Sequence, residues 1–158
     1  MNKHIRILWF LTIVLVLSCQ NGNVTPIFDT DKELGIWVDL WNTYDLTQVE
    51  NIFITDNTVT YFSSEKEGLI KGYDEVVEHH IGFGFVEGGK ETENRLWLED
   101  LNTQVHDSSV TVSGIWFFRR STDEEGAEPQ KGPVTFVYVY TESGYRIAHV
   151  NFSTYRVE

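Results

Sequence analysis

Apolar side chains recur at helical spacing at the start of the region that follows residue 30. Leu34, Trp37 and Trp41 fall on one face of a helix that runs to residue 44, and Thr30 or Asp31 can cap its first turn. The face is large and aromatic, which is typical of a helix that packs its apolar side on a sheet. The pattern therefore predicts an amphipathic helix over residues 31–44.

Three further elements are predicted before residue 93. Residues 46–53 favour a second, short helical turn, and residues 58–64 alternate as in a strand. Gly72 opens a third helix, which ends at Gly82. The residues expected on the apolar face of that helix are Val76, Val77, His80 and Ile81.

From residue 93 onwards the hydrophobic pattern changes to a period of two. Short polar turns at 106–109 and 142–144 suit antiparallel hairpins, and residues 121–132 form a longer connection. The pattern predicts a meander of four long strands, over residues 95–106, 110–120, 133–140 and 145–155.

Two of these strands are apolar at consecutive positions, over residues 115–118 and 136–140. Such runs predict that both faces of the sheet are covered. The helices can cover one face. We expect a second copy of the chain on the other, which predicts a homodimer formed through the sheet face.

Composition and charge narrow the possible partners. The chain has 158 residues, enough for one domain, and its 24 Asp and Glu against 12 Lys and Arg give a formal charge of −12. Such a field repels phosphate backbones, so nucleic acid is not an expected partner.

The sequence holds no glycine-rich phosphate loop, nucleophile elbow or paired cysteines. His79 and His80 point about 100° apart on a helix. We therefore expect no cofactor and no metal site.

The first eighteen residues have the features of an export signal. Lys3 and Arg6 precede an uncharged apolar run over residues 7–17. As a helix this run spans about 16 Å, about half of a bilayer core, which disfavours a permanent membrane span. The run ends in Val16-Leu17-Ser18-Cys19, which resembles the lipobox of bacterial lipoproteins. The resemblance implies that Cys19, the only cysteine, is acylated after cleavage; an ordinary free thiol is the alternative.

The resemblance to lipoproteins defines three segments. Residues 1–18 are the signal peptide, residues 19–30 are the lipidated N-terminus with a polar tether, and residues 31–158 are the domain. Loss of the signal leaves 10 basic against 24 acidic side chains, a formal charge of −14. The expected location is the periplasmic side of the cell envelope, with membrane contact through the lipid anchor only. Gln20 beside Cys19 favours the outer membrane, because an Asp there retains some lipoproteins in the inner one.

The order of elements and several motifs resemble SnoaL-like members of the nuclear transport factor 2-like superfamily. The resemblance covers residues 31–156 and implies an α+β cone, in which about three helices pack on a curved, mostly antiparallel sheet around a pocket. The motifs are Trp37-x3-Trp41-x2-Tyr44-Asp45, the run 56–62, the helix entry at 72–76 and the terminal strand at 144–153.

Candidate ligand contacts come from the last strand and from the aromatic residues. His149 and Asn151 share one strand face with Ser153, and a polar row of this kind suits a pocket wall. The alternatives are a face toward solvent or an interface, or a buried imidazole satisfied by a neighbour. Core packing explains most of the aromatic candidates equally well. The expected aromatic wall consists of Trp41, Tyr44, Tyr61, Trp116 and Tyr138.

Three functions remain open. The favoured one is a binding module for a small apolar or amphipathic molecule. The second is an isomerase-, cyclase- or dehydratase-like enzyme that transfers protons with His149 and either Tyr44 or Asp45; no carboxylate follows Tyr61 until Glu65, which weakens this hypothesis. The third is a dimeric interaction domain whose pocket is filled by bulky side chains.

Overall fold

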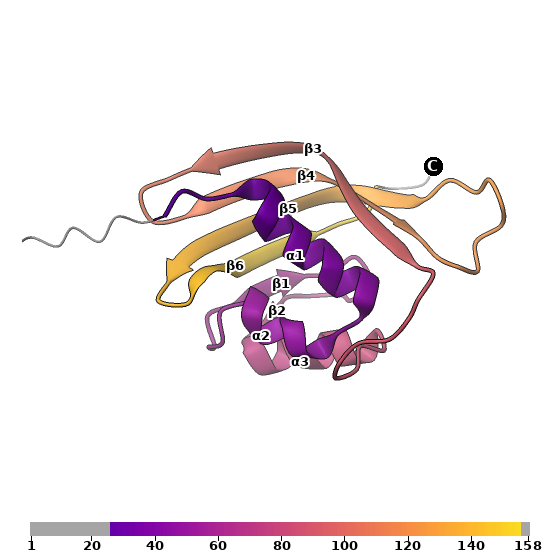
Figure 1. Ribbon diagram of the computed structural model, residues 1–158, viewed down its shortest axis with the longest axis horizontal. Helices are drawn as coiled ribbons and strands as arrows, with labels where there is room; N and C mark the ends of the chain where they lie inside the picture. The colour runs from indigo at the N-terminus through magenta and orange to yellow at the C-terminus, as the bar shows by residue number, and fades with distance from the viewer. Residues whose placement is uncertain (1–25, 156–158) are drawn as a thin grey trace, which may run out of the picture.

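The computed structural model describes residues 26–155, so the expected signal peptide and Cys19 lie outside the described residues. Three α-helices and a short 3-10 turn pack on a curved six-stranded sheet (Figure 1). In chain order the elements are α1 (Thr30–Thr43), η1 (Leu46–Gln48), α2 (Val49–Ile52), β1 (Thr60–Phe62), β2 (Ile70–Lys71), α3 (Tyr73–Gly82), β3 (Arg95–Val105), β4 (Val110–Arg119), β5 (Gln130–Thr141) and β6 (Gly144–Phe152).

Helix α1 forms where the spacing of apolar residues predicts it. Its cap is Asp29, one residue before the expected position, and the Asp29 carboxylate accepts a hydrogen bond from the Lys32 amide at 3.1 Å. Leu34, Trp37, Leu40 and Trp41 are buried on its inner face. The helix ends at Tyr44, whose left-handed backbone (φ 54°) turns the chain toward η1.

The predicted four-strand meander is confirmed. The strand order is β2-β1-β6-β5-β4-β3, with antiparallel pairing throughout β3 to β6. Two features were not predicted: β1 pairs in parallel with β6, and the two-residue strand β2 pairs with β1. The long connection between β4 and β5 lies at one end of the sheet, and the hairpin from β5 to β6 lies at the other (Figure 1).

A bulge interrupts β3, which is the last strand at one side of the sheet. The register of pairing with β4 shifts between Glu99 and Asn102, and Asp100 adopts a left-handed backbone (φ 54°). Gly114 lies opposite the bulge. A Cβ atom there would approach Leu101 Cδ2 to 2.7 Å, so the bulge requires a glycine in β4.

The inner face of the sheet and the helices share one aromatic core. Trp37 is fully buried and meets the Phe136 ring edge-on at a centroid distance of 4.8 Å. On α3 the buried residues are Val76, His79 and His80, whereas Ile81 is 43% exposed. The expected apolar face of this helix was therefore partly wrong, because the aromatic rings around the helix accept both imidazoles in place of Ile81.

The outer face of the sheet carries half-buried apolar side chains. Trp97 stacks on Phe117 at 5.2 Å, and the Lys131 ammonium lies 5.8 Å from the Phe117 ring. Ile115 and Val137 lie on the same face. The second copy of the chain that would cover this face stays a prediction.

Two glycines provide a matched test of this packing. A Cβ at Gly132 would lie 1.9 Å from the Ser153 carbonyl oxygen, whereas at Gly35, in α1, it would meet open space. We expect Gly132→Ala to lower the free energy of unfolding by about 3 kcal/mol, and Gly35→Ala to raise it by about 0.5–1 kcal/mol. Denaturant unfolding followed by tryptophan fluorescence measures both. An unchanged stability of Gly132→Ala would contradict the close approach of β5 to the chain after β6.

Candidate functional site

A cavity of about 110 Å³ lies between the end of α1 and the inner face of the sheet. The meander places the ends of β4 and β6 beside the starts of β3 and β5, and β1 ends there too. The walls are formed by Trp41, Tyr44, Tyr61, Phe83, Leu96, Trp116, Phe118 and Phe152. The polar lining residues are Ser63, Ser64, Glu65, Asn94, Arg120 and Gln130.

A hydrogen-bonded chain fixes the Tyr44 side of this cavity. The Asn94 amide nitrogen donates to the Tyr44 hydroxyl at 2.8 Å, and the Asn94 carbonyl oxygen accepts from the Ser121 amide at 2.9 Å. The Lys90 ammonium lies 4.6 Å from the Tyr44 ring centroid. These contacts join the end of α1 to the segments before β3 and after β4.

The opposite wall depends on Trp116. Its indole nitrogen donates to the Ser153 carbonyl oxygen at 2.7 Å, and its ring stacks on Phe152 at 4.3 Å. Trp41 lies 6.2 Å from Phe152 with the rings nearly parallel, at 3°. Phe152 therefore packs against both indoles and links the two aromatic walls of the cavity.

The mouth of the cavity is polar and contains one cation. Glu65, Arg120 and Gln130 are exposed, and the Arg120 guanidinium lies 3.9 Å from the Glu65 carboxylate and 3.5 Å from the Gln130 side-chain oxygen. Both charged side chains are about half exposed, 47% and 48%, so the ion pair contributes little to stability. Arg120 can therefore exchange Glu65 for a ligand at small cost.

The structure brings together four of the seven expected ligand contacts. Trp41, Tyr44, Tyr61 and Trp116 all line the cavity. Tyr138 is buried toward the opposite end of α1, where its ring packs on Phe28 at 5.0 Å, and burial raises the pKa of its hydroxyl.

The remaining two expected contacts lie on the outer face of the sheet, which corrects the prediction that they form the pocket wall. Val150 and Phe152 are buried inward, so His149 and Asn151, which alternate with them, point outward. His149 Nδ1 lies 2.8 Å from the Thr60 hydroxyl, and partial burial lowers the pKa of the imidazole. The burial of Val150 and Phe152 therefore decides which face of β6 points inward.

Asp45, the other expected acid–base residue, is a capping residue. Its carboxylate accepts hydrogen bonds from the Thr47 hydroxyl at 2.7 Å, the Thr47 amide at 3.0 Å and the Gly88 amide at 3.1 Å. The hydrogen bond from the Thr47 hydroxyl is the main cause of a lowered pKa of Asp45. The candidates His149, Tyr44 and Asp45 are therefore not assembled into one site.

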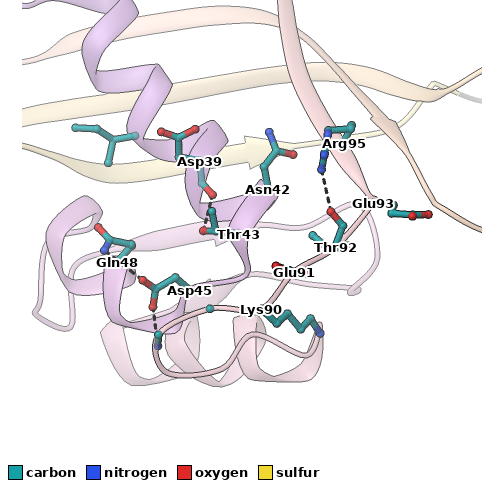
Figure 2. A pocket seen from close by; sticks show the side chains of 13 residues that line it. Asp39, Asn42, Thr43, Asp45, Gln48, Lys90, Glu91, Thr92, Glu93 and Arg95 are labelled. Carbon is teal, nitrogen blue, oxygen red and sulfur yellow. Dashed lines mark hydrogen bonds between the residues drawn. The ribbon is translucent and has the colours of Figure 1, made fainter.

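Asp45 lines a broad surface hollow of about 1100 Å³ beside α1 (Figure 2). Carboxylates of Asp39, Glu91 and Glu93 and the cations of Lys90 and Arg95 surround it. Polar groups of the hollow form hydrogen bonds with nearby parts of the chain. Arg95 donates to the Thr92 carbonyl oxygen, and the Asp45 carboxylate accepts from the Gly88 amide. The hollow is wide and lined by polar residues, whereas the smaller cavity is less open and lined by aromatic rings, and we take the cavity as the candidate site.

Residues 26–155 offer neither a cluster of metal ligands nor a membrane-spanning helix. No three His, Cys, Asp or Glu side chains in this range are placed to share a metal ion. None of the helices within it has the length and apolar character needed to cross a bilayer.

His80 lies behind the cavity walls, inside the aromatic cluster. Its Nδ1–H donates to the Val76 carbonyl oxygen at 2.7 Å, which leaves Nε2 as a buried acceptor without a partner among the described residues. The Trp41, Phe53, Tyr61 and Phe85 rings surround it. Burial lowers the pKa of His80 to about 4.

Sequence analysis missed Glu65, Asn94, Arg120 and Gln130. They lie in or next to loops far apart along the chain, and no motif joins them. The sequence did contain one signal for these residues. In an antiparallel meander, polar residues that follow one strand lie at the same end of the sheet as polar residues that precede the neighbouring strand. Applied to residues 94, 120 and 130, this rule locates the mouth.

Comparison with known proteins identifies the fold. No protein-family model matches the chain, and no curated protein matches it. A nuclear transport factor 2-like superfamily protein from Salmonella enterica aligns with a TM-score of 0.64 and 18% identity, over 80% of this chain and 88% of that one. An NTF2-like protein of unknown function from Pseudomonas putida aligns with 0.63 and 13%, over 77% and 81%.

The association domain of C. elegans CaMKII aligns with a TM-score of 0.62 and 17% identity, over 78% of this chain and 91% of that one. The expected nuclear transport factor 2-like α+β cone is thus confirmed. At these identities the similarity concerns the fold.

The buried His80 predicts a pH-dependent stability. Because the pKa is about 4 in the folded chain and about 6.5 when unfolded, protons bind the unfolded state preferentially between these values. The free energy of unfolding should therefore fall as pH drops from about 6.5 to about 4, by up to about 3 kcal/mol from this residue. Denaturant unfolding at several pH values should show a shallower dependence for His80→Phe. The exposed control His106→Phe should retain the original slope; equal slopes in all three proteins would contradict the assignment.

Proposed function

With the nuclear transport factor 2-like fold as scaffold, we propose that the chain is a binding protein whose cavity takes one small apolar group of an amphipathic molecule. The observation that carries the proposal is the aromatic-lined cavity with a cation at its mouth. Aromatic walls bind flat apolar groups, and a few polar groups at the opening orient them.

The size of the cavity limits what enters it. At about 110 Å³ it is smaller than ligand pockets for drug-sized molecules, which hold about 300–1,000 Å³. It is also smaller than the cavity of about 150 Å³ that admits benzene in an engineered protein. A single ring or short alkyl group therefore fills the space once the walls adjust, and the rest of the ligand remains at the mouth.

The mouth of the cavity favours a ligand whose polar part is anionic. Arg120 offers planar N–H donors that match a carboxylate, and its bond to Glu65 is long, at 3.9 Å. The net charge of the chain opposes the approach of an anion at long range, but salt screens such fields beyond about 8 Å. At short range, the contact with Arg120 then makes an anionic ligand preferred over a neutral or cationic one.

The proton-transfer alternative finds less support in the geometry. His149 lies on the outer face of the sheet and Asp45 caps η1, so neither reaches the cavity. Glu65 is the one carboxylate in the cavity lining, and it lies exposed at the mouth beside Arg120. The interaction-domain alternative predicts a filled interior, and the residual cavity favours binding instead.

The proposal also includes the location of the chain. We place it on the periplasmic side of the cell envelope, held in the outer membrane by acyl chains on Cys19. The export signal over residues 1–18 and the lone cysteine directly after it support this assignment. Helix α1 follows Cys19 by eleven residues, so a polar tether separates the lipid from the domain.

Lipidation predicts the chemistry of the mature N-terminus. Mass spectrometry of the protein from membranes should find a first peptide that begins at Cys19 and carries acyl groups. Cys19→Ser should leave the signal uncleaved and remove the acyl mass. A mature chain that begins elsewhere, with a free Cys19 thiol, would contradict the anchor and leave the cavity proposal unaffected.

The ligand class is tested with three probes that share one ring: benzoate, benzyl alcohol and benzylamine. We expect benzoate to bind best by titration calorimetry, because Arg120 pairs with its carboxylate. Arg120→Gln should weaken benzoate binding about tenfold and leave benzyl alcohol unchanged. The matched control is Arg119→Gln, which alters the neighbouring residue on the outer face and should change neither affinity.

A blocking variant separates cavity binding from surface binding. Ser64→Phe adds a ring to the cavity lining and should abolish binding of all three probes, whereas Thr122→Phe, in an exposed loop, should not. Equal affinity of the three probes for both variants and the original chain would contradict the proposal.

A further inference from the structure

The end of the sheet opposite the cavity mouth carries an exposed apolar patch. Ile27 is 96% exposed, Val105 72% and Tyr140 45%. All three line one surface groove of about 490 Å³, together with Phe28, Tyr145 and the turn after β3. We call Ile27, Val105 and Tyr140 the apolar end.

The chain enters the domain at this end. The Tyr145 hydroxyl donates to the Pro26 carbonyl oxygen at 2.7 Å. Phe28 packs between Tyr138 and Tyr145, with ring centroids at 5.0 and 4.9 Å. Figure 1 shows the described chain beginning beside the β3–β4 turn, away from the long β4–β5 connection at the opposite side of the view. The point at which the chain enters the domain is thus fixed by contacts of Pro26 and Phe28.

The length of the chain before Pro26 limits how far this end can be from the lipid. Six residues separate Cys19 from Pro26. Seven Cα–Cα steps reach at most about 25 Å when fully extended. This distance is below the diameter of a small domain, about 30 Å. An acylated Cys19 therefore keeps the apolar end closer to the bilayer than the cavity mouth.

The groove itself carries little charge. The groove beside the apolar end is lined by a single carboxylate, that of Asp107, and by the His106 imidazole. By contrast, Asp123, Glu124, Glu125 and Glu128 lie in the connection at the mouth end. Acidic surfaces are repelled by anionic headgroups, whereas aliphatic and tyrosine side chains are favoured at the membrane interface.

From these observations we infer that the apolar end rests on the phospholipid surface and that the cavity mouth faces away from it. The inference depends on the proposed acylation of Cys19 and extends it, because the lipid is then not the only membrane contact. The partner is the headgroup region of the bilayer, which accepts Ile27, Val105 and Tyr140 without a defined pocket.

The test uses the full acylated chain in phosphatidylcholine vesicles. Cys19 is the only cysteine and its thiol is blocked by acylation, so an introduced cysteine is the single site for a fluorescent label. The reporter variant is Val105→Cys and the control is Thr122→Cys; both positions are exposed, at opposite ends of the sheet. A spin-labelled phosphatidylcholine should extinguish most of the fluorescence at residue 105 and leave that at residue 122 unchanged.

The outcomes separate orientation from anchoring. Flotation of the chain with the vesicles reports the anchor. Flotation with equal quenching at both positions, or with none at either, overturns the orientation and leaves the anchor intact. A chain that does not float overturns both. If a chain that begins at Gln20, without the signal and Cys19, instead dimerises in solution, and Val105→Asp restores the monomer, the apolar end is an interface between copies and the inference is overturned.

Discussion

The packing of α1 against the concave face of the sheet is the contact on which the rest of the molecule depends. Trp37 and Trp41 project from one face of this helix onto Phe136 and Phe152 of the central strands. Each buried indole removes about 150–250 Å² from water, which contributes about 4–6 kcal/mol before the loss of side-chain entropy. Without α1, Phe136 and Phe152 would lose the indoles that pack on them.

The same packing determines where space remains. Trp37 and Phe136 fill the middle of the cone, and Phe28 closes the groove toward the N-terminal segment by packing on Tyr138. Among the described residues, the aromatic-lined cavity remains where α1 ends, because the left-handed turn at Tyr44 takes the chain away from the sheet. The two ends of the cone consequently differ in chemistry, one polar with a cation and one aliphatic.

Hydrophobic periodicity predicted the elements of this fold better than it predicted their orientation. The spacing of Leu34, Trp37 and Trp41 was sufficient for α1, and alternation was sufficient for the meander. The two residues of β2 carry no pattern of their own, because the strand exists only through pairing with β1. His149 was assigned to the wrong face because polar residues were given priority over the buried pair Val150 and Phe152. The mouth residues were missed because they meet only after folding.

The bulge in β3 limits the pairing of this sheet with other chains. β3 is a free edge of the sheet, and such edges are templates for pairing with other chains. Asp100, with its left-handed backbone and charged side chain, interrupts the ladder at mid-strand. The opposite edge, β2, is two residues long. Neither edge therefore offers an uninterrupted ladder on which further chains could add as the strands of a fibril.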